Sequence, residues 1–103
     1  MRIVAGVTTA ERRSYLVEAY RPGATADDVR RASRRLAAAT WALARDGEPI
    51  RFVASTFVPA EESCFFRFEG SSADLVARAC ADAEVSAARI HAVLDLREEP
   101  CDS

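Results

Sequence analysis

The sequence has no long apolar run and no excess of one sign of charge. The stretch from Ile3 to Val7 ends at Thr8, which is too short for a signal-peptide core, and no later stretch approaches about 18 apolar residues. The formal net charge is −2 and the pI is near 5.4. Contact with nucleic acid or an anionic membrane would therefore need a local basic patch. We expect a cytoplasmic protein with no membrane partner.

Cysteine, histidine and glycine are also scarce. Cys64, Cys80 and Cys101 are widely spaced and form no C-x-x-C pair, which argues against a disulfide framework or a zinc knuckle and favours reduced thiols. The chain has no glycine-rich phosphate loop and no serine elbow, and its one histidine is His91. These absences favour a non-enzymatic role, although a carboxylate or His91 could still act as an acid or base.

What is present is the composition of one folded domain. The chain has 103 residues, of which 50% are hydrophobic and 29% charged. We expect the domain to cover residues 14–96. Residues 1–13 are predicted to be an N-terminal extension, either weakly ordered or holding a short extra strand at 2–7, and residues 97–103 a C-terminal tail.

Hydrophobic periodicity predicts six elements in the order strand, helix, strand, strand, helix, strand. The strands are expected at 14–20, 50–58, 63–69 and 89–96, a helix of roughly twenty residues between Thr25 and Gly47, and a shorter helix after Ser71 or Ser72. One stripe of the long helix, formed by Val29, Ala32, Leu36, Ala39 and Leu43, should lie on the sheet. This order predicts an α+β ferredoxin-like βαββαβ sandwich, with a four-stranded antiparallel sheet and both helices on one face.

The other face of this sheet would be open. Alternation in the last strand groups Ile90, Ala92, Leu94 and Leu96 as the apolar set and places Arg89, His91, Val93 and Asp95 opposite. By the same reasoning Phe65, Arg67 and Glu69 should face outward, with Glu18 and Tyr20 from the first strand. A half-apolar open face predicts a homodimer formed through it.

Several segments together resemble a known family. They are Tyr15-Leu16-Val17-Glu18, Pro22-Gly23, Gly47-Glu48-Pro49-Ile50-Arg51, Ser55-Thr56-Phe57-Val58-Pro59 with Glu62, Cys64 and Phe65, and Arg89-Ile90. In these the chain is similar to a bacterial family of small ferredoxin-like proteins of uncharacterised role, one of whose members is described as a nickel-binding protein. The resemblance implies a dimeric ferredoxin-like fold and transition-metal binding. Phe66 stands where a second cysteine is expected, and Glu84-Val85-Ser86 replaces a Gly-x-Pro turn, so the family's ligands are not carried over.

Candidate ligands for nickel or another divalent transition metal are therefore chosen by chemistry. Imidazole and carboxylate suit nickel, copper or zinc, and the candidates are His91, Glu18, Glu69 and Asp95. Cys64 is an alternative ligand as a thiolate. The competing interpretations are that His91 is a surface or interface residue and that Cys64 is a small core residue.

Two other functions remain open. The first is a dimeric small-molecule-binding or cofactor-independent oxygenase-like protein, whose pocket on the open face would use Tyr20, Phe52 and Phe65. The second is a partner surface on the long helix formed by Trp41, Arg34 and Arg45. Arginine beside tryptophan can bind nucleic acid, but a cation-π pair on a solvated helix is the favoured interpretation.

Overall fold

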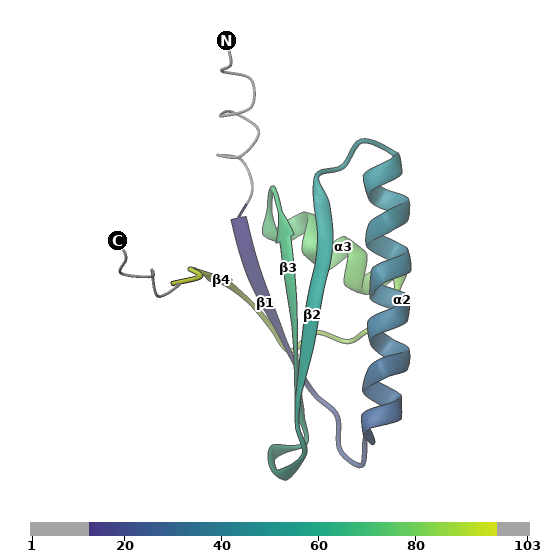
Figure 1. The fold of residues 1–103 in the computed structure, drawn as a ribbon, viewed down its shortest axis with the longest axis vertical. Helices are drawn as coiled ribbons and strands as arrows, with labels where there is room; N and C mark the ends of the chain where they lie inside the picture. The colour runs from purple at the N-terminus through teal and green to yellow at the C-terminus, as the bar shows by residue number, and fades with distance from the viewer. Residues whose placement is uncertain (1–12, 97–103) are drawn as a thin grey trace, which may run out of the picture.

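The computed structural model describes residues 13–96, which form one α+β unit (Figure 1). Its elements are β1 (Arg13–Tyr20), α2 (Ala26–Arg45), β2 (Ile50–Val58), the short 3-10 helix η1 (Pro59–Glu61), β3 (Ser63–Gly70), α3 (Ala73–Asp82) and β4 (Arg89–Val93). The extension predicted over residues 1–13 lies outside the described residues except for Arg13, which begins β1, and so does the predicted tail over 97–103.

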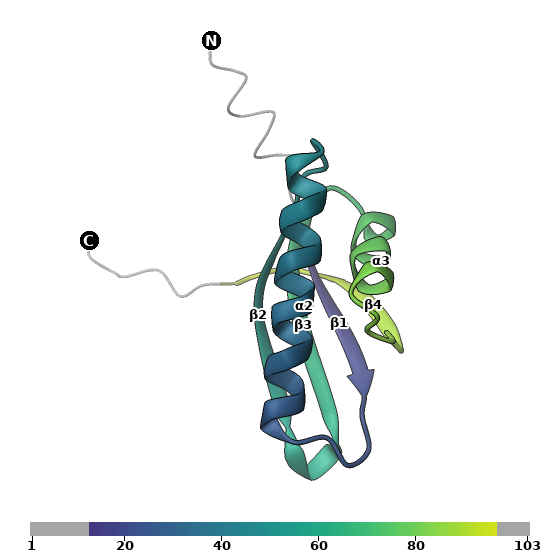
Figure 2. The ribbon, with the colours of Figure 1, turned by 90° about the vertical axis from the view of Figure 1, so that its right-hand side faces the viewer.

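The four strands form a single sheet in the order β2-β3-β1-β4, and every neighbouring pair is antiparallel. Both helices lie on the same side of this sheet, with α2 running along β2 and β3 and α3 nearer to β1 and β4 (Figures 1 and 2). This arrangement confirms the predicted ferredoxin-like fold. It leaves the opposite side, which we call the open face, without a covering helix.

Capping residues fix where the two helices begin. The backbone N–H of Asp28 donates to the Thr25 hydroxyl at 3.2 Å, and the Asp28 carboxylate accepts from the backbone N–H of Thr25 at 2.8 Å, which completes a capping box. At the start of α3 the backbone N–H of Leu75 donates to the Ser72 hydroxyl at 3.2 Å. After α2 the chain turns at Gly47, whose φ of 92° is a left-handed conformation that glycine adopts without steric cost.

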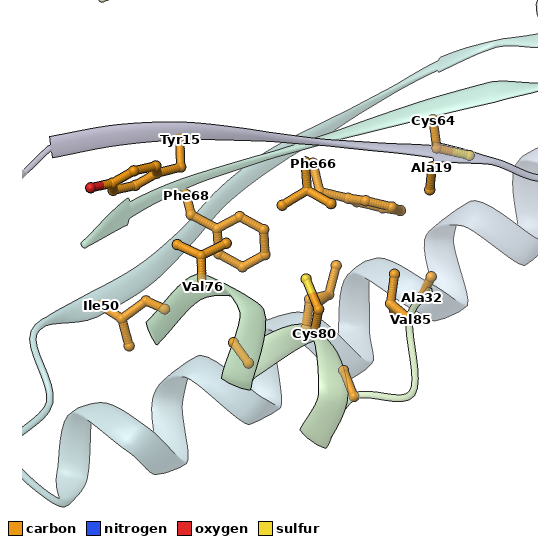
Figure 3. Close-up of a cluster of buried hydrophobic side chains, with 14 of the residues drawn as sticks. Tyr15, Ala19, Ala32, Ile50, Cys64, Phe66, Phe68, Val76, Cys80 and Val85 are labelled. Atoms are coloured by element: carbon orange, nitrogen blue, oxygen red, sulfur yellow. The ribbon is translucent and has the colours of Figure 1, made fainter. Parts of the chain in front are cut away.

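The hydrophobic core fills the space between the sheet and the helices (Figure 3). Tyr15, Val17 and Ala19 of β1 alternate with more exposed residues and point into this space, as do Phe66 and Phe68 of β3. The predicted helix stripe meets them, because Val29, Ala32, Leu36 and Leu43 are buried and Ala39 packs against the core. Each strand therefore has one core side and one open side, as its period of two requires.

The chain departs from the predicted pattern at two places. Val53 is an extra residue in β2, because Phe52 pairs with Phe68 and Ala54 pairs with the adjacent Arg67. The last strand ends at Val93 instead of continuing to Leu96, so the alternation assumed for its final residues is wrong. After Val93 the chain leaves the sheet on the side away from the helices (Figure 1). There Asp95 forms an ion pair with Arg67 of β3.

Within residues 13–96, neither helix has the length and apolarity needed to cross a membrane.

Candidate functional site

On the open face, where β1 meets the edge strand β4, an imidazole and a carboxylate are paired. His91 Nε2 lies 3.1 Å from Glu18 Oε1, and we call these two residues the His91–Glu18 pair. Glu18 stands directly opposite Arg89 in the β1-β4 register, so the contact with His91 is a diagonal one between neighbouring strands. The side chains are 41% and 36% exposed, which leaves both accessible to a dissolved ion. Of the predicted ligands His91, Glu18, Glu69 and Asp95, the structure brings the first two into contact.

A second polar cluster lies at the other end of the face. The Arg51 guanidinium donates to Glu69 at 3.1 Å, Arg67 forms an ion pair with Asp95, and the Ser14 hydroxyl donates to Asp95 at 3.3 Å. We call Arg51, Arg67, Glu69 and Asp95 the arginine–carboxylate cluster. All four residues, together with Val53 and Leu96, line a hollow of about 350 Å³.

The four carboxylate and imidazole candidates therefore fall into two separate groups. Glu69 stands opposite Ser14, which is four residues from Glu18 along β1 and so about 13 Å away. Glu69 and Asp95 also each have an arginine partner, which offsets the negative charge a cation would use. Across residues 13–96 no cluster of three or more histidine, cysteine or carboxylate side chains could hold a metal ion. One chain brings together two of the candidate ligands.

Cys64 lies on the opposite side of the sheet from the His91–Glu18 pair. It is fully buried in the core (Figure 3) and stands across from Ala19. Burial raises the pKa of the Cys64 thiol, with a smaller opposing effect from Arg21. A buried thiol with a raised pKa stays protonated, and a protonated thiol is a poor metal ligand. The structure thus places Cys64 as a core residue.

The aromatic residues predicted to form a ligand pocket are also divided. Tyr20 and Phe65 belong to the open face, since they pair with the non-core positions of the neighbouring strands. Phe52 lies on the core side, where its ring is 5.4 Å from that of Phe68 and 6.4 Å from that of Phe66. The bulge at Val53 is the reason that alternation along β2 could not have been followed from sequence.

Glu62, which follows η1, has a structural role beside this face. Its carboxylate accepts from the Tyr20 hydroxyl at 3.3 Å and from the backbone N–H of Gly23 at 3.2 Å. Its backbone is left-handed, with φ of 53°. Glu62 therefore ties the turn between β2 and β3 to the loop between β1 and α2.

The helix residues named as a partner surface lie on α2, away from the open face. Trp41 is 64% exposed, and the Arg45 guanidinium carbon lies 4.9 Å from its ring centroid, a cation-π contact. Arg34 is exposed one turn or more before them. The favoured interpretation, a cation-π pair on a solvated helix, therefore holds for Trp41 and Arg45.

The fold and the site define a ferredoxin-like domain with a polar open sheet face. No protein-family model matches the chain, and no curated protein matches it. A search of solved structures finds a protein of Streptomyces coelicolor A3(2), SCO4226, known from a crystal structure analysis. The two share 28% sequence identity and a TM-score of 0.64, over 81% of this chain and 99% of that one. The similarity supports the ferredoxin-like arrangement.

Proposed function

We propose that this chain is a small, non-enzymatic metal-binding protein that takes up a divalent transition metal such as nickel as a homodimer. The observation that carries the proposal is the His91–Glu18 pair, a partly exposed imidazole and carboxylate 3.1 Å apart on the uncovered side of the sheet, where β1 meets β4. This ligand chemistry suits nickel, copper or zinc. The family resemblance read from the sequence points in the same direction.

A single copy of the pair is an incomplete site, which is why the proposal includes a second chain. Two protein ligands bind a divalent ion weakly, whereas transition-metal sites normally use three or four. In a twofold dimer, residues near the axis meet their own counterparts. Two chains facing each other through the open face would thus supply two imidazoles and two carboxylates to one ion.

The uncovered apolar surface on this face also supports a second copy. Leu96 is 87% exposed beside the arginine–carboxylate cluster, and Tyr20 is 63% exposed at the other end of β1. Phe65 contributes further apolar surface between them. A face that combines such apolar groups with an incomplete set of metal ligands is better buried against a copy of itself than left in water.

The test is calorimetric titration of the metal-free protein with nickel chloride and zinc sulfate, with light scattering to measure its mass. We expect saturable binding at submillimolar concentration or better, with one ion per two chains and a shift to dimer. His91→Ala and Glu18→Gln should each remove it. Glu69→Gln is the matched control, since it changes a carboxylate of the same face that lies about 13 Å away, and it should leave binding intact.

Absence of saturable binding by the wild type would overturn the proposal, and so would binding that survives His91→Ala. Binding of one ion per chain with no change in mass would refute the shared site. Cys64→Ala should leave the affinity unchanged, because that thiol is buried on the other side of the sheet.

A small-molecule-binding or oxygenase-like role is the second candidate, and the hollow beside the arginine–carboxylate cluster favours it. Its volume of about 350 Å³ falls within the range of ligand pockets, and Val53 and Leu96 give it an apolar wall. Binding of a planar phenol such as 1-naphthol, followed by its fluorescence, would test this role. Loss of binding in Arg67→Gln with retention in His91→Ala would support the second candidate over the first.

A further inference from the structure

A small hollow lies between α2 and the beginning of β2, at the β2 edge of the sheet. It has a volume of about 200 Å³ and is lined by Ala37, Thr40, Trp41, Ala44, Ile50, Arg51 and Phe52. Pockets for drug-sized molecules span roughly 300–1,000 Å³, so this space is too small for such a ligand. It is of a size that suits one amino-acid side chain.

The walls of this hollow, which we call the Trp41 hollow, are mainly apolar. Ala37 and Ala44 leave the space beside the indole open because their side chains are short. The Thr40 hydroxyl donates to the carbonyl of Ala37 at 3.1 Å, so its hydrogen is already used. Trp41 itself is 64% exposed and forms the outer wall. An apolar side chain would bury this surface without stranding a polar group.

Two arginines lie on the same side of α2 as the Trp41 hollow, and one of them, Arg45, stacks over the Trp41 ring. Arg34 and Arg45 follow the same side of α2 as Ala37 and Trp41, at spacings of three or four residues. Within residues 13–96 neither arginine has an ion-pair partner, whereas Arg30 is paired with Asp27 of the first turn. All 14 basic residues of the chain are arginines, the side chain best suited to bind a carboxylate through two hydrogen bonds.

The neighbouring strand also presents a free edge. β2 is the first strand in the sheet order and pairs only with β3 in the described part of the chain. A groove between a helix and an edge strand accepts extended peptide segments, with main chain along the strand and alternate side chains in pockets. The bulge at Val53 limits such pairing to the few residues before it, so the segment must be short.

We propose that the Trp41 hollow docks a short, extended acidic peptide segment of a partner protein, with one apolar side chain beside Trp41 and flanking carboxylates on Arg34 and Arg45. The apolar walls favour the apolar side chain of the peptide, and the arginines favour its carboxylates. This surface is separate from the His91–Glu18 pair, so it does not depend on the proposed metal site.

Trp41 is the one tryptophan of the chain and therefore reports directly on the hollow. The experiment titrates the full chain with a blocked hexapeptide, EEVLEE, while Trp41 fluorescence is recorded, and repeats the titration with KKVLKK and with single-stranded poly-dT. We expect a saturable blue shift with the acidic peptide and none with the other two probes. Calorimetry measures EEVLEE binding to Trp41→Phe, a variant that keeps an aromatic wall but lacks the indole fluorescence.

The arginines are tested by Arg34→Gln and Arg45→Gln. Each should weaken EEVLEE binding by up to about fivefold, the range of an exposed ion pair. The matched control is Arg78→Gln, an exposed arginine of α3 outside the hollow, which should not change the affinity. No saturable response to EEVLEE below about 1 mM would overturn the proposal, as would equal binding of KKVLKK. Binding of poly-dT in place of the peptide would refute it in favour of a nucleic-acid contact.

Discussion

Two adjacent phenylalanines of β3 offer a direct test of which side of the sheet is the core. Phe66 is fully buried and stands opposite Val17, whereas Phe65 is half-buried on the open face opposite Glu18. The same substitution to alanine at neighbouring positions therefore removes the same atoms from two different environments. The difference between the two costs measures the contribution of the core side alone.

The expected costs differ severalfold. Removing a fully buried phenylalanine ring leaves a cavity and costs about 3–5 kcal/mol, whereas we expect the loss of a half-exposed ring to cost less than about 1.5 kcal/mol. A chain of this size has a stability of about 5–15 kcal/mol, so Phe66→Ala could bring it near unfolding. Phe66→Leu, with an expected cost of about 1–1.5 kcal/mol, keeps the measurement possible in that case.

Urea unfolding followed by circular dichroism, with thermal unfolding in parallel, provides the assay. For a domain of this size each kcal/mol lowers the melting temperature by about 4–8 °C, so Phe66→Ala should lower it by at least about 12 °C. The metal-free protein should be studied at low concentration, so that any association through the open face does not contribute. Equal costs for Phe65→Ala and Phe66→Ala under these conditions would refute the assignment of faces.

Three further predictions concern the helix cap and the buried thiol. Thr25→Ala should lower the free energy of unfolding by about 1 kcal/mol in urea titrations, because the backbone N–H of Asp28 loses its acceptor. Hydrogen bonds with the Thr25 backbone and hydroxyl hold the pKa of Asp28 below its ordinary 3.8. The ionised Asp28 therefore contributes to the free energy of unfolding above pH 3.8, and this contribution is lost as the pH falls through the lowered folded pKa. Asp28→Ala should flatten the acid side of a plot of the free energy of unfolding against pH. Burial raises the pKa of Cys80 from 9.0 to about 11, so stability should fall between these values by up to about 1.4 kcal/mol per pH unit, and Cys80→Ala should remove that fall.

Much of the fold could be predicted because local signals agreed with one another. Thr25 as the cap and Gly47 after the helix bounded α2, and the predicted range of β2 matched its observed bounds. The burial of alternate residues in β1 and β3 followed from period two alone. These features depend on neighbours in sequence, which a reader of the sequence can see.

The parts that sequence could not predict depend on contacts between distant residues. The bulge at Val53 changes the phase of alternation along β2, so that Phe52 and Phe57, an odd number of residues apart, both lie on the core side. Its only trace in the sequence is an uninformative run of small and β-branched residues. The chain beyond the end of β4 at Val93 places Asp95 beside Arg67, an ion pair between β3 and a segment outside the strands. Alternation gives a side of the sheet but no position along it, so Glu69 was grouped with ligands about 13 Å away.

The dimensions of the open face connect metal binding to association. Four strands of eight, nine, eight and five residues, at about 3.3 Å per residue and spaced about 4.8 Å apart, present roughly 480 Å² in projection. Stable complexes bury about 800 Å² on each partner, so two such faces should associate only weakly by themselves. A metal ion held by the His91–Glu18 pairs of both chains would supply the missing free energy, and the dimer would in turn supply the missing ligands. Dimerisation and metal affinity should therefore rise together with protein concentration, whereas an ion bound within one chain would show no such dependence.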